Sequence, residues 1–242
     1  MSVDTNAVRA VADEAEAPAE PPETGDSPYP PAPWRLRGWA VQSLHLVDIA
    51  AVRPILPPGL RIVPVAPGRT LGCTYVAGYG PGSVLEYHEL IVLPALTWRA
   101  GRIGFWVSHI YVDHPASAAG GRAVWNLPKE LADFSVEEGG GRRRVEVSQS
   151  GRRLLGIESG RARGGLPLRI PLPAFGTLDG TPRFFTGWAR SRLGLAGLRV
   201  DPAPDGPFAG LGLGRPFLGL SFAGLDLLAA APKSTVGGSA TR

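Results

Sequence analysis

The stretch RIGFWVSHIYVD, residues 102–113, carries apolar side chains on both of the faces that an extended chain would present. If this stretch forms one strand, its side chains point alternately to two faces. One face then carries Phe105, Val107, His109 and Tyr111, and the other carries Trp106, Ser108, Ile110 and Val112. A half-exposed strand would alternate apolar with polar residues. Two apolar faces instead predict a strand buried on both sides, as in a filled or ligand-holding β-barrel.

Further strand-like segments lie on both sides of this stretch, separated by Pro and Gly. They are residues 39–47, 61–66, 69–80, 87–93, 142–149, 152–158, 161–173, 181–193 and 216–228. The segments 142–149 and 152–158 form a predicted hairpin around Ser150-Gly151. Strands do not alternate with long helices, so the sequence predicts a mainly β (α+β) fold of antiparallel strands with a few short flanking helices.

Three short helical segments are predicted between these strands. Asp48 can cap a helix over residues 48–55, which the following Pro57-Pro58-Gly59 ends. Residues 114–125 are small and helix-compatible, and a further helical turn is predicted over residues 128–134, because Pro is favoured at a first helical position.

The composition is typical of a globular protein of 242 residues with one substantial core, and its 33 Gly and 25 Pro favour many turns. No apolar run approaches the roughly 18 residues of a membrane helix. The N-terminus lacks the basic and apolar regions of a signal peptide. Cys73 is the only cysteine, so an intramolecular disulfide is impossible and a cytoplasmic location is expected.

Charge is distributed unevenly along the chain. Residues 1–30 hold seven acidic residues against one arginine and are rich in Ala and Pro, so they are predicted to form a disordered leader. A single domain is expected over residues 31–231 and a flexible tail over residues 232–242. Outside the leader the chain is basic, but its arginines are scattered singly apart from residues 142–144, and no nucleic-acid-binding motif is present. Neither nucleic acid nor a membrane is expected as a partner.

No cofactor motif and no complete metal-ligand set is present. Gly210, Gly212 and Gly214 lack the third glycine and the strand–helix context of a dinucleotide fingerprint. His109 with Asp113 could offer two ligands from one strand face without a third partner, which is better explained by a packed histidine followed by a turn. We therefore predict no metal and no cofactor.

The stretch AVWNLPKELA, residues 123–132, contains a lysine in a chain that almost never uses one. Of 25 basic residues only Lys129 and Lys233 are lysines. Arginine replaces lysine wherever charge alone matters, but it cannot supply a neutral amine. A desolvated lysine can lose its proton and attack a carbonyl carbon to form a Schiff base. The alternative is a surface lysine in the first turn of a short helix, and composition alone leaves both open.

Several segments around this lysine resemble the acetoacetate decarboxylase family. They are Tyr111-Val112-Asp113, Gly121-Arg122, Leu127-Pro128-Lys129, the upstream Tyr87-His88-Glu89, and RPILPPGLRI at residues 53–62. The resemblance covers roughly residues 34–150. It implies that Lys129 is a Schiff-base nucleophile, that Glu89 is the pocket carboxylate, that the fold is an antiparallel, cone-like β-barrel, and that the protein is a homo-oligomer.

The sequence also departs from the family pattern. Glu130 follows Lys129 where classical members have a second lysine, and an adjacent carboxylate favours the protonated, non-nucleophilic amine. The family's arginine for the substrate carboxylate falls at Gly38, beside Arg37, and a second family glutamate falls near Thr74. These departures argue against acetoacetate itself as the substrate. The resemblance assigns substrate binding to a set of four residues, namely Arg37, Thr74, Tyr111 and Trp125.

Two functions follow from these observations. The first is a Schiff-base enzyme acting on a small keto acid or ketone, with lyase-type chemistry (decarboxylation, or aldol and dehydration steps). The second is a non-catalytic β-barrel that binds an apolar small molecule, which the two-sided apolar strands and the lost substrate-binding positions favour.

Overall fold

The computed structural model describes residues 27–232. Most of the predicted leader and all but the first residue of the predicted tail lie outside the described residues. Of the leader, residues 27–30 are described, and Tyr29 packs against the apolar cluster that contains Trp34.

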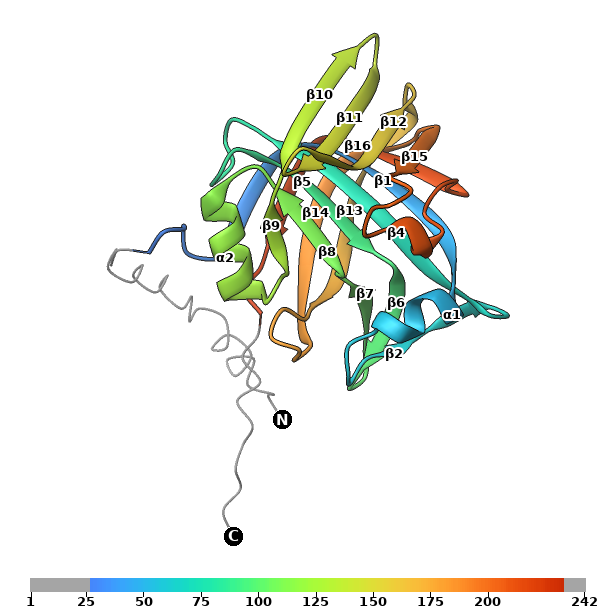
Figure 1. Cartoon of the computed structure of the whole chain (residues 1–242). Coiled ribbons are helices and arrows are strands. Elements are labelled where there is room, and N and C mark those ends of the chain that lie inside the picture. The colour runs from blue at the N-terminus through green and yellow to red at the C-terminus, as the bar shows by residue number, and fades with distance from the viewer. Residues whose placement is uncertain (1–26, 233–242) are drawn as a thin grey trace, which may run out of the picture.

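The structure is mainly β, as predicted, and is built on one large sheet (Figure 1). Its strands are β1 (Trp34–Asp48), β2 (Arg61–Ile62), β3 (Pro64–Ala66), β4 (Arg69–Tyr79), β5 (Tyr87–Leu93), β6 (Ala95–Arg99), β7 (Arg102–Trp106), β8 (His109–Val112), β9 (Lys129–Leu131), β13 (Arg163–Gly176), β14 (Arg183–Leu195) and β16 (Leu218–Ala229). They pair in the order β2-β6-β7-β13-β14-β16-β1-β4-β5-β8-β9, with β3 beside β4.

A second, four-stranded sheet packs on the outer face of the large one. It consists of β10 (Asp133–Gly139), β11 (Arg142–Gln149), β12 (Arg152–Ser159) and β15 (Leu198–Pro202), all antiparallel. Four helical segments complete the described chain, namely α1 (Ile49–Val52), η1 (Arg53–Ile55), α2 (Pro115–Trp125) and η2 (Ala209–Leu211). The core between the sheets includes Val41 and Val76 from one side and Val147 and Leu155 from the other.

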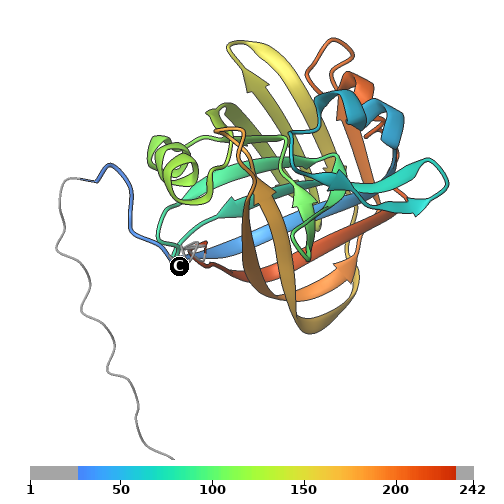
Figure 2. The same ribbon diagram turned by 90° about the horizontal axis from the view of Figure 1, so that it is seen from below.

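The large sheet curls strongly but does not close into the predicted barrel (Figure 2). Its hydrogen-bonded order ends at β2 and β9, which do not pair with each other. It is also mixed rather than purely antiparallel, because β7 pairs with β13 and β8 with β9 in parallel. The prediction of a mainly β fold is therefore confirmed, and the expected closure is corrected.

Residues 102–113 form two strands, β7 and β8, instead of the one predicted. The amide of Val107 donates to the Phe175 carbonyl at 3.0 Å, and the amide of Ser108 donates to the Val92 carbonyl at 3.1 Å. The chain thus leaves β13 and joins β5 within two residues. The break also changes which residues share a face, because Phe105 and Val107 line the interior of the curl before it and Ile110 lines it after. The predicted common face of Phe105 and Tyr111 is therefore wrong.

The helices begin as predicted, but one predicted helical turn is absent. The Asp48 side chain accepts a hydrogen bond from the Ala50 amide at 2.9 Å and caps α1. Helix α2 ends at Asn126, whose backbone is left-handed with φ of 57°. The chain then enters β9, so the helical turn predicted over residues 128–134 is wrong. Within residues 27–232, no helix combines the length and apolarity needed to cross a membrane.

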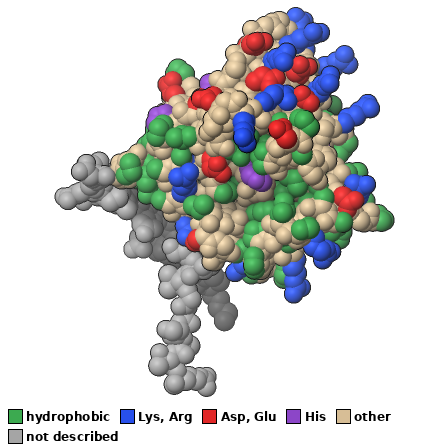
Figure 3. All heavy atoms as spheres, in the orientation of Figure 1, with side chains coloured by type: hydrophobic (Ala, Val, Ile, Leu, Met, Phe, Trp, Pro, Cys, Tyr) green, Lys and Arg blue, Asp and Glu red, His purple; other side chains and the backbone are tan. Residues whose placement is uncertain are grey.

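The hairpin β11–β12 confirms the turn predicted at Ser150-Gly151, since both residues have positive φ, 51° and 75°. Figure 3 shows arginines on this side of the molecule interspersed with acidic side chains. Arg143 pairs with Glu138 at 2.7 Å and Arg153 with Glu146 at 2.8 Å. The arginine cluster at residues 142–144 therefore lies among carboxylates and forms no unbroken basic surface.

His45 is a buried histidine on the face of β1 that points away from the interior of the curl. Only 1% of it is exposed, and its Nε2 lies 2.8 Å from the Ser43 hydroxyl, which in turn hydrogen-bonds Thr74. Burial lowers the pKa of His45 to about 4, and the nearby backbone of Arg215 offsets only part of this effect.

The folded protein should lose stability as the pH falls from about 6.5 to about 4. In this range the unfolded state binds a proton at His45 that the folded state does not. Each unit of pKa difference is worth about 1.4 kcal/mol, so the loss approaches about 3 kcal/mol. Urea unfolding at several pH values measures it. The His45→Gln variant should show a shallower dependence on pH, and an unchanged slope would contradict this assignment.

Candidate active site

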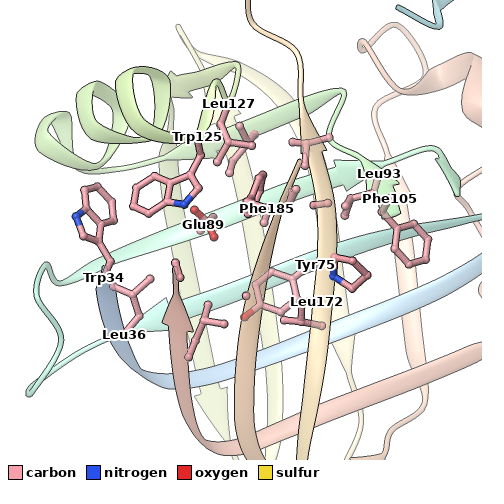
Figure 4. A pocket seen from close by; sticks show the side chains of 18 of the residues that line it. Trp34, Leu36, Tyr75, Glu89, Leu93, Phe105, Trp125, Leu127, Leu172 and Phe185 are labelled. Atoms are coloured by element: carbon pink, nitrogen blue, oxygen red, sulfur yellow. The ribbon is translucent and has the colours of Figure 1, made fainter. Parts of the chain in front are cut away.

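An apolar cavity of about 170 Å³ lies inside the curl of the large sheet (Figure 4). Its walls come from both arms of the sheet and from the end of α2. Apolar side chains dominate the lining, including Trp34, Leu93, Phe105, Trp125, Leu127 and Leu172. The two charged side chains among the described residues that line it are Lys129 and Glu89.

Lys129 and Glu89 form a buried ion pair in this cavity. Lys129 Nζ lies 2.7 Å from Glu89 Oε2 and donates a second hydrogen bond to the Ser117 hydroxyl at 3.0 Å. The lysine residue is 3% exposed and the glutamate 5%. A buried charge is stable only when it is paired and hydrogen-bonded, so each of these groups depends on the other.

Three tyrosines surround the carboxylate of Glu89. The Tyr79 hydroxyl donates to Glu89 Oε1 at 3.3 Å and lies 3.3 Å from the Tyr75 hydroxyl. The Tyr87 ring centroid is 5.1 Å from Lys129 Nζ. Burial raises the pKa of Tyr79 and Tyr87 well above the usual value, and the negative charge of Glu89 adds to the effect. The tyrosines therefore stay neutral and act as hydrogen-bond donors and apolar walls.

Lys129 points inward because of the turn that follows α2. The amides of Asn126 and Leu127 donate back to the Arg122 and Gly121 carbonyls at 3.2 and 3.1 Å, which ends the helix. The chain then pairs in parallel with β8, and Lys129 lies beside Ile110, which also faces the cavity.

The pair Gly121-Arg122 has a direct structural role at this turn. A Cβ atom on Gly121 would lie 2.4 Å from Lys129 Cδ, so only glycine leaves space for the lysine stem. Arg122 Nε donates to the Lys129 carbonyl oxygen at 2.6 Å and fixes the backbone that carries the amine. Gly121 and Arg122 thus both position Lys129, and neither of them lines the cavity.

Glu130 lies on the opposite face of β9 from Lys129. Its Oε2 accepts a hydrogen bond from Gln149 at 2.9 Å, and the residue is exposed. Because successive side chains of a strand point to opposite faces, this carboxylate stays outside the cavity although it is adjacent in sequence. Glu89, 40 residues upstream, is the carboxylate that contacts the amine.

The structure brings together three of the six predicted site residues. Lys129 and Glu89 make the ion pair, and Trp125 lines the cavity with its ring edge-to-face against Trp34 at 4.9 Å. The indole Nε1 of Trp125 donates to the Ala230 carbonyl at 2.8 Å, which anchors the end of α2 to the segment after β16.

Arg37, Thr74 and Tyr111 do not line this cavity, so the structure does not bring these three predicted substrate-binding residues to it. Arg37 is on the outer face of β1, where its guanidinium lies 3.9 Å from Asp226. Thr74 faces away from the cavity and hydrogen-bonds Ser43. Tyr111 packs edge-on against Phe208 between the two sheets, because the break before β8 reverses the face.

Several residues around the ion pair escaped the sequence analysis. Ser117, Tyr75 and Tyr79 contact the ion pair directly or through one hydroxyl, and Trp34 lies 5.8 Å from Lys129 Nζ. The alternation of β4 contained a signal for the two tyrosines, since Tyr75 and Tyr79 are an even number of residues apart and so share a face. Ser117 gave no signal, because it meets Lys129 only through the fold of α2.

No group of three or more His, Cys, Asp or Glu side chains within residues 27–232 lies close enough together to hold a metal ion. His88 and Asp113 pair at 2.7 Å on the outer face of β5, away from the cavity. Inside the cavity, Lys129 and Glu89 offer an amine and a carboxylate in apolar surroundings.

Comparison with known proteins agrees with this geometry. A family model described as "Acetoacetate decarboxylase (ADC)" matches residues 16–170. The chain belongs to the acetoacetate decarboxylase family. Protein NEOXANTHIN-DEFICIENT 1 of Oryza sativa subsp. japonica is 33% identical over 129 residues, which is 52% of this chain and 42% of the rice protein. The chain thus matches less than half the length of the curated plant relatives.

Solved structures share the fold at low sequence identity. Acetoacetate decarboxylase from Legionella pneumophila superimposes with a TM-score of 0.64 at 19% identity, covering 90% of this chain and 92% of the other. The enduracididine biosynthesis enzyme MppR, complexed with pyruvate, gives 0.60 at 21% identity, covering 82% and 89%. These similarities establish the family fold, and the site described above is this chain's own.

Gly121→Ala should destabilise the protein and displace the lysine. The added methyl group would overlap the Lys129 stem, and overpacking of this kind costs about 1–3 kcal/mol. Urea unfolding measures the loss. Gly210→Ala is the matched control, because a Cβ there meets nothing within 4 Å. Equal losses of stability in the two variants would show that the space between Gly121 and the Lys129 side chain does not require a glycine.

Proposed function

We propose that this protein is a Schiff-base enzyme in which Lys129 condenses with the carbonyl carbon of a small ketone or keto acid. The observation that carries the proposal is the primary amine buried in an apolar cavity, 2.7 Å from a carboxylate that can exchange a proton with it. A lysine that only supplies charge at the surface would not be buried in this way. Lys129 is also the one lysine among the described residues.

The reaction begins with transfer of a proton from Lys129 Nζ to Glu89 Oε2. The neutral amine attacks the carbonyl carbon to give a carbinolamine. Glu89 then returns its proton to the departing hydroxyl group, which leaves as water, and a C=N bond forms. The iminium ion accepts the electron pair of an adjacent C–C bond, which supports decarboxylation or retro-aldol cleavage, or in reverse an aldol condensation followed by dehydration.

The relatives support this chemistry in outline. The family contains acetoacetate decarboxylases, and the structural neighbour MppR is described with bound pyruvate, a small keto acid. For this chain the choice between making and breaking the C–C bond stays open. The position of Glu130 outside the cavity removes one objection to a nucleophilic Lys129, since that carboxylate does not contact the amine.

A non-catalytic binder of an apolar small molecule is the second candidate. The predominantly apolar lining of the cavity favours it. In that function the Lys129–Glu89 pair would serve as a polar anchor without covalent chemistry, so covalent trapping separates the two candidates.

We further propose that residues 31–231 form one domain, that the protein works in the cytoplasm and that it forms a homo-oligomer. The buried, unpaired Cys73 fits a reducing compartment. Size-exclusion chromatography with light scattering measures the assembly.

Borohydride reduction in the presence of a panel of ketones and keto acids should give a stable adduct on Lys129. Reduction of the iminium converts it to a secondary amine, which intact-mass and peptide mass spectrometry detect. Lys129→Arg keeps the positive charge and removes the amine, so it should give no adduct. No adduct on folded wild-type protein across the panel would favour the non-catalytic binder.

Glu89→Gln should slow adduct formation by about 100-fold or more, because a positioned acid–base group contributes about 10²–10⁴-fold. A time course of borohydride trapping gives the rate, and circular dichroism checks the fold. Glu130→Gln is the matched control, since this neighbouring carboxylate lies on the outer face, and its rate should stay within about twofold of wild type. Equal slowing in both variants would remove Glu89 from the proton transfers.

A further inference from the structure

The charges of the cavity balance each other completely. Lys129 and Glu89 are its only charged side chains among the described residues, and they pair at 2.7 Å. The nearby arginines do not reach it, because Arg37 is turned toward Asp226 and Arg122 holds the backbone of Lys129. A ligand carboxylate would therefore meet no free cation inside.

This balance determines which substrate the proposed chemistry can accept. With an uncharged ketone, the iminium ion on Lys129 remains paired with the carboxylate of Glu89. With a keto acid, the same intermediate would carry a second carboxylate and leave one buried negative charge without a partner. Burying an unpaired charge costs several kcal/mol. Resting on the proposed Schiff-base function, we infer that the substrate is an uncharged ketone or aldehyde with an apolar body. Of the reactions named above, this inference keeps the aldol-type steps and excludes decarboxylation, which needs a substrate carboxylate.

The cavity also has room for an apolar body of moderate size. A volume of about 170 Å³ is close to the roughly 150 Å³ of an apolar cavity that binds benzene. Glu89 and Leu93 both line it from β5, four residues apart, which corresponds to about 13 Å along a strand. In this proposal the carbonyl group lies at Lys129 and the apolar body extends toward Leu172 and Phe105, which line the same cavity (Figure 4).

One uncharged polar group offers a contact in the same cavity. Gln42 lines it, and its Nε2 donates at 3.4 Å to Cys73 Sγ, a weak acceptor. Burial raises the pKa of the Cys73 thiol to about 12, so the sulfur carries no charge. A hydroxyl or ether oxygen on the substrate can replace the sulfur as the partner of Gln42. Neither the Gln42 amide nor the Cys73 thiol carries a positive charge that would compensate a carboxylate.

An isosteric pair of probes tests the charge preference. 5-Methyl-2-hexanone and 4-oxopentanoate have the same carbon skeleton around the ketone, with an isopropyl group in one and a carboxylate in the other. On wild-type protein, the probe concentration that gives half-maximal borohydride trapping should be at least about tenfold lower for 5-methyl-2-hexanone than for 4-oxopentanoate. Equal or better trapping of the keto acid would overturn this substrate class and leave the Schiff-base proposal standing.

If neither probe is trapped, the Schiff-base proposal is judged by the wider panel of ketones and keto acids described above, and equilibrium binding tests the ligand class separately. Tryptophan fluorescence, with Trp34 and Trp125 in the cavity, measures equilibrium binding of the same two compounds without reduction. Tighter binding of the ketone supports the apolar, uncharged ligand class, and equal binding, tighter keto-acid binding or no binding overturns it.

Substitution of Gln42 supplies the converse test. Gln42→Arg adds a cation to the cavity lining and should raise trapping or binding of 4-oxopentanoate several-fold, while Gln42→Leu should not. Circular dichroism confirms that both variants are folded. Failure of the arginine to change the preference in a folded variant would show that charge balance does not select the ligand.

Discussion

The ion pair between Lys129 and Glu89 is the constraint around which this molecule is arranged. Two charges buried in an apolar cavity, 3% and 5% exposed, are costly unless each satisfies the other. The fold meets that condition with a bond of 2.7 Å and supporting hydroxyl groups from Ser117 and Tyr79. Buried pairs contribute little to stability compared with apolar residues of the same volume, so stability alone does not account for this pair.

Local turns bring the two charges together. Glu89 is fixed by the regular alternation of β5, which needs nothing beyond a central strand. Lys129 depends on a longer chain of requirements: a left-handed Asn126 ends α2, and Gly121 leaves room for the lysine stem. The parallel pairing of β9 with β8 then turns the amine inward and Glu130 outward. A shift of one residue in β9 would exchange the two side chains and bring a second carboxylate into the cavity.

The sequence predicted the parts of this arrangement that depend on local patterns. Alternation placed β5 at residues 87–93, the Ser150-Gly151 turn predicted its hairpin, and the scarcity of lysine pointed to Lys129. It missed what depends on distant pairing. The amides of Val107 and Ser108 bond to different strands, and this break turns Tyr111 away from the site. The side chains are apolar on both faces before and after this break, because one face lines the cavity and the other packs between the two sheets. Their pattern therefore did not indicate that the break exchanges the two faces.

The absence of a second cation in the cavity has a structural cause in β1. A Cβ on Gly38 would lie 1.9 Å from the Gly78 carbonyl oxygen, so the paired strand leaves no room there for an arginine. Arg37, one residue away, is on the other face. In the proposed chemistry the proton transfers are left to Lys129 and Glu89, because no other described residue with a charged side chain lines the cavity and burial raises the pKa of the surrounding phenols, Tyr79 among them. The close approach of β1 and β4 at Gly38 thus underlies the charge balance of the cavity, on which both the proposed chemistry and the inferred ligand class depend.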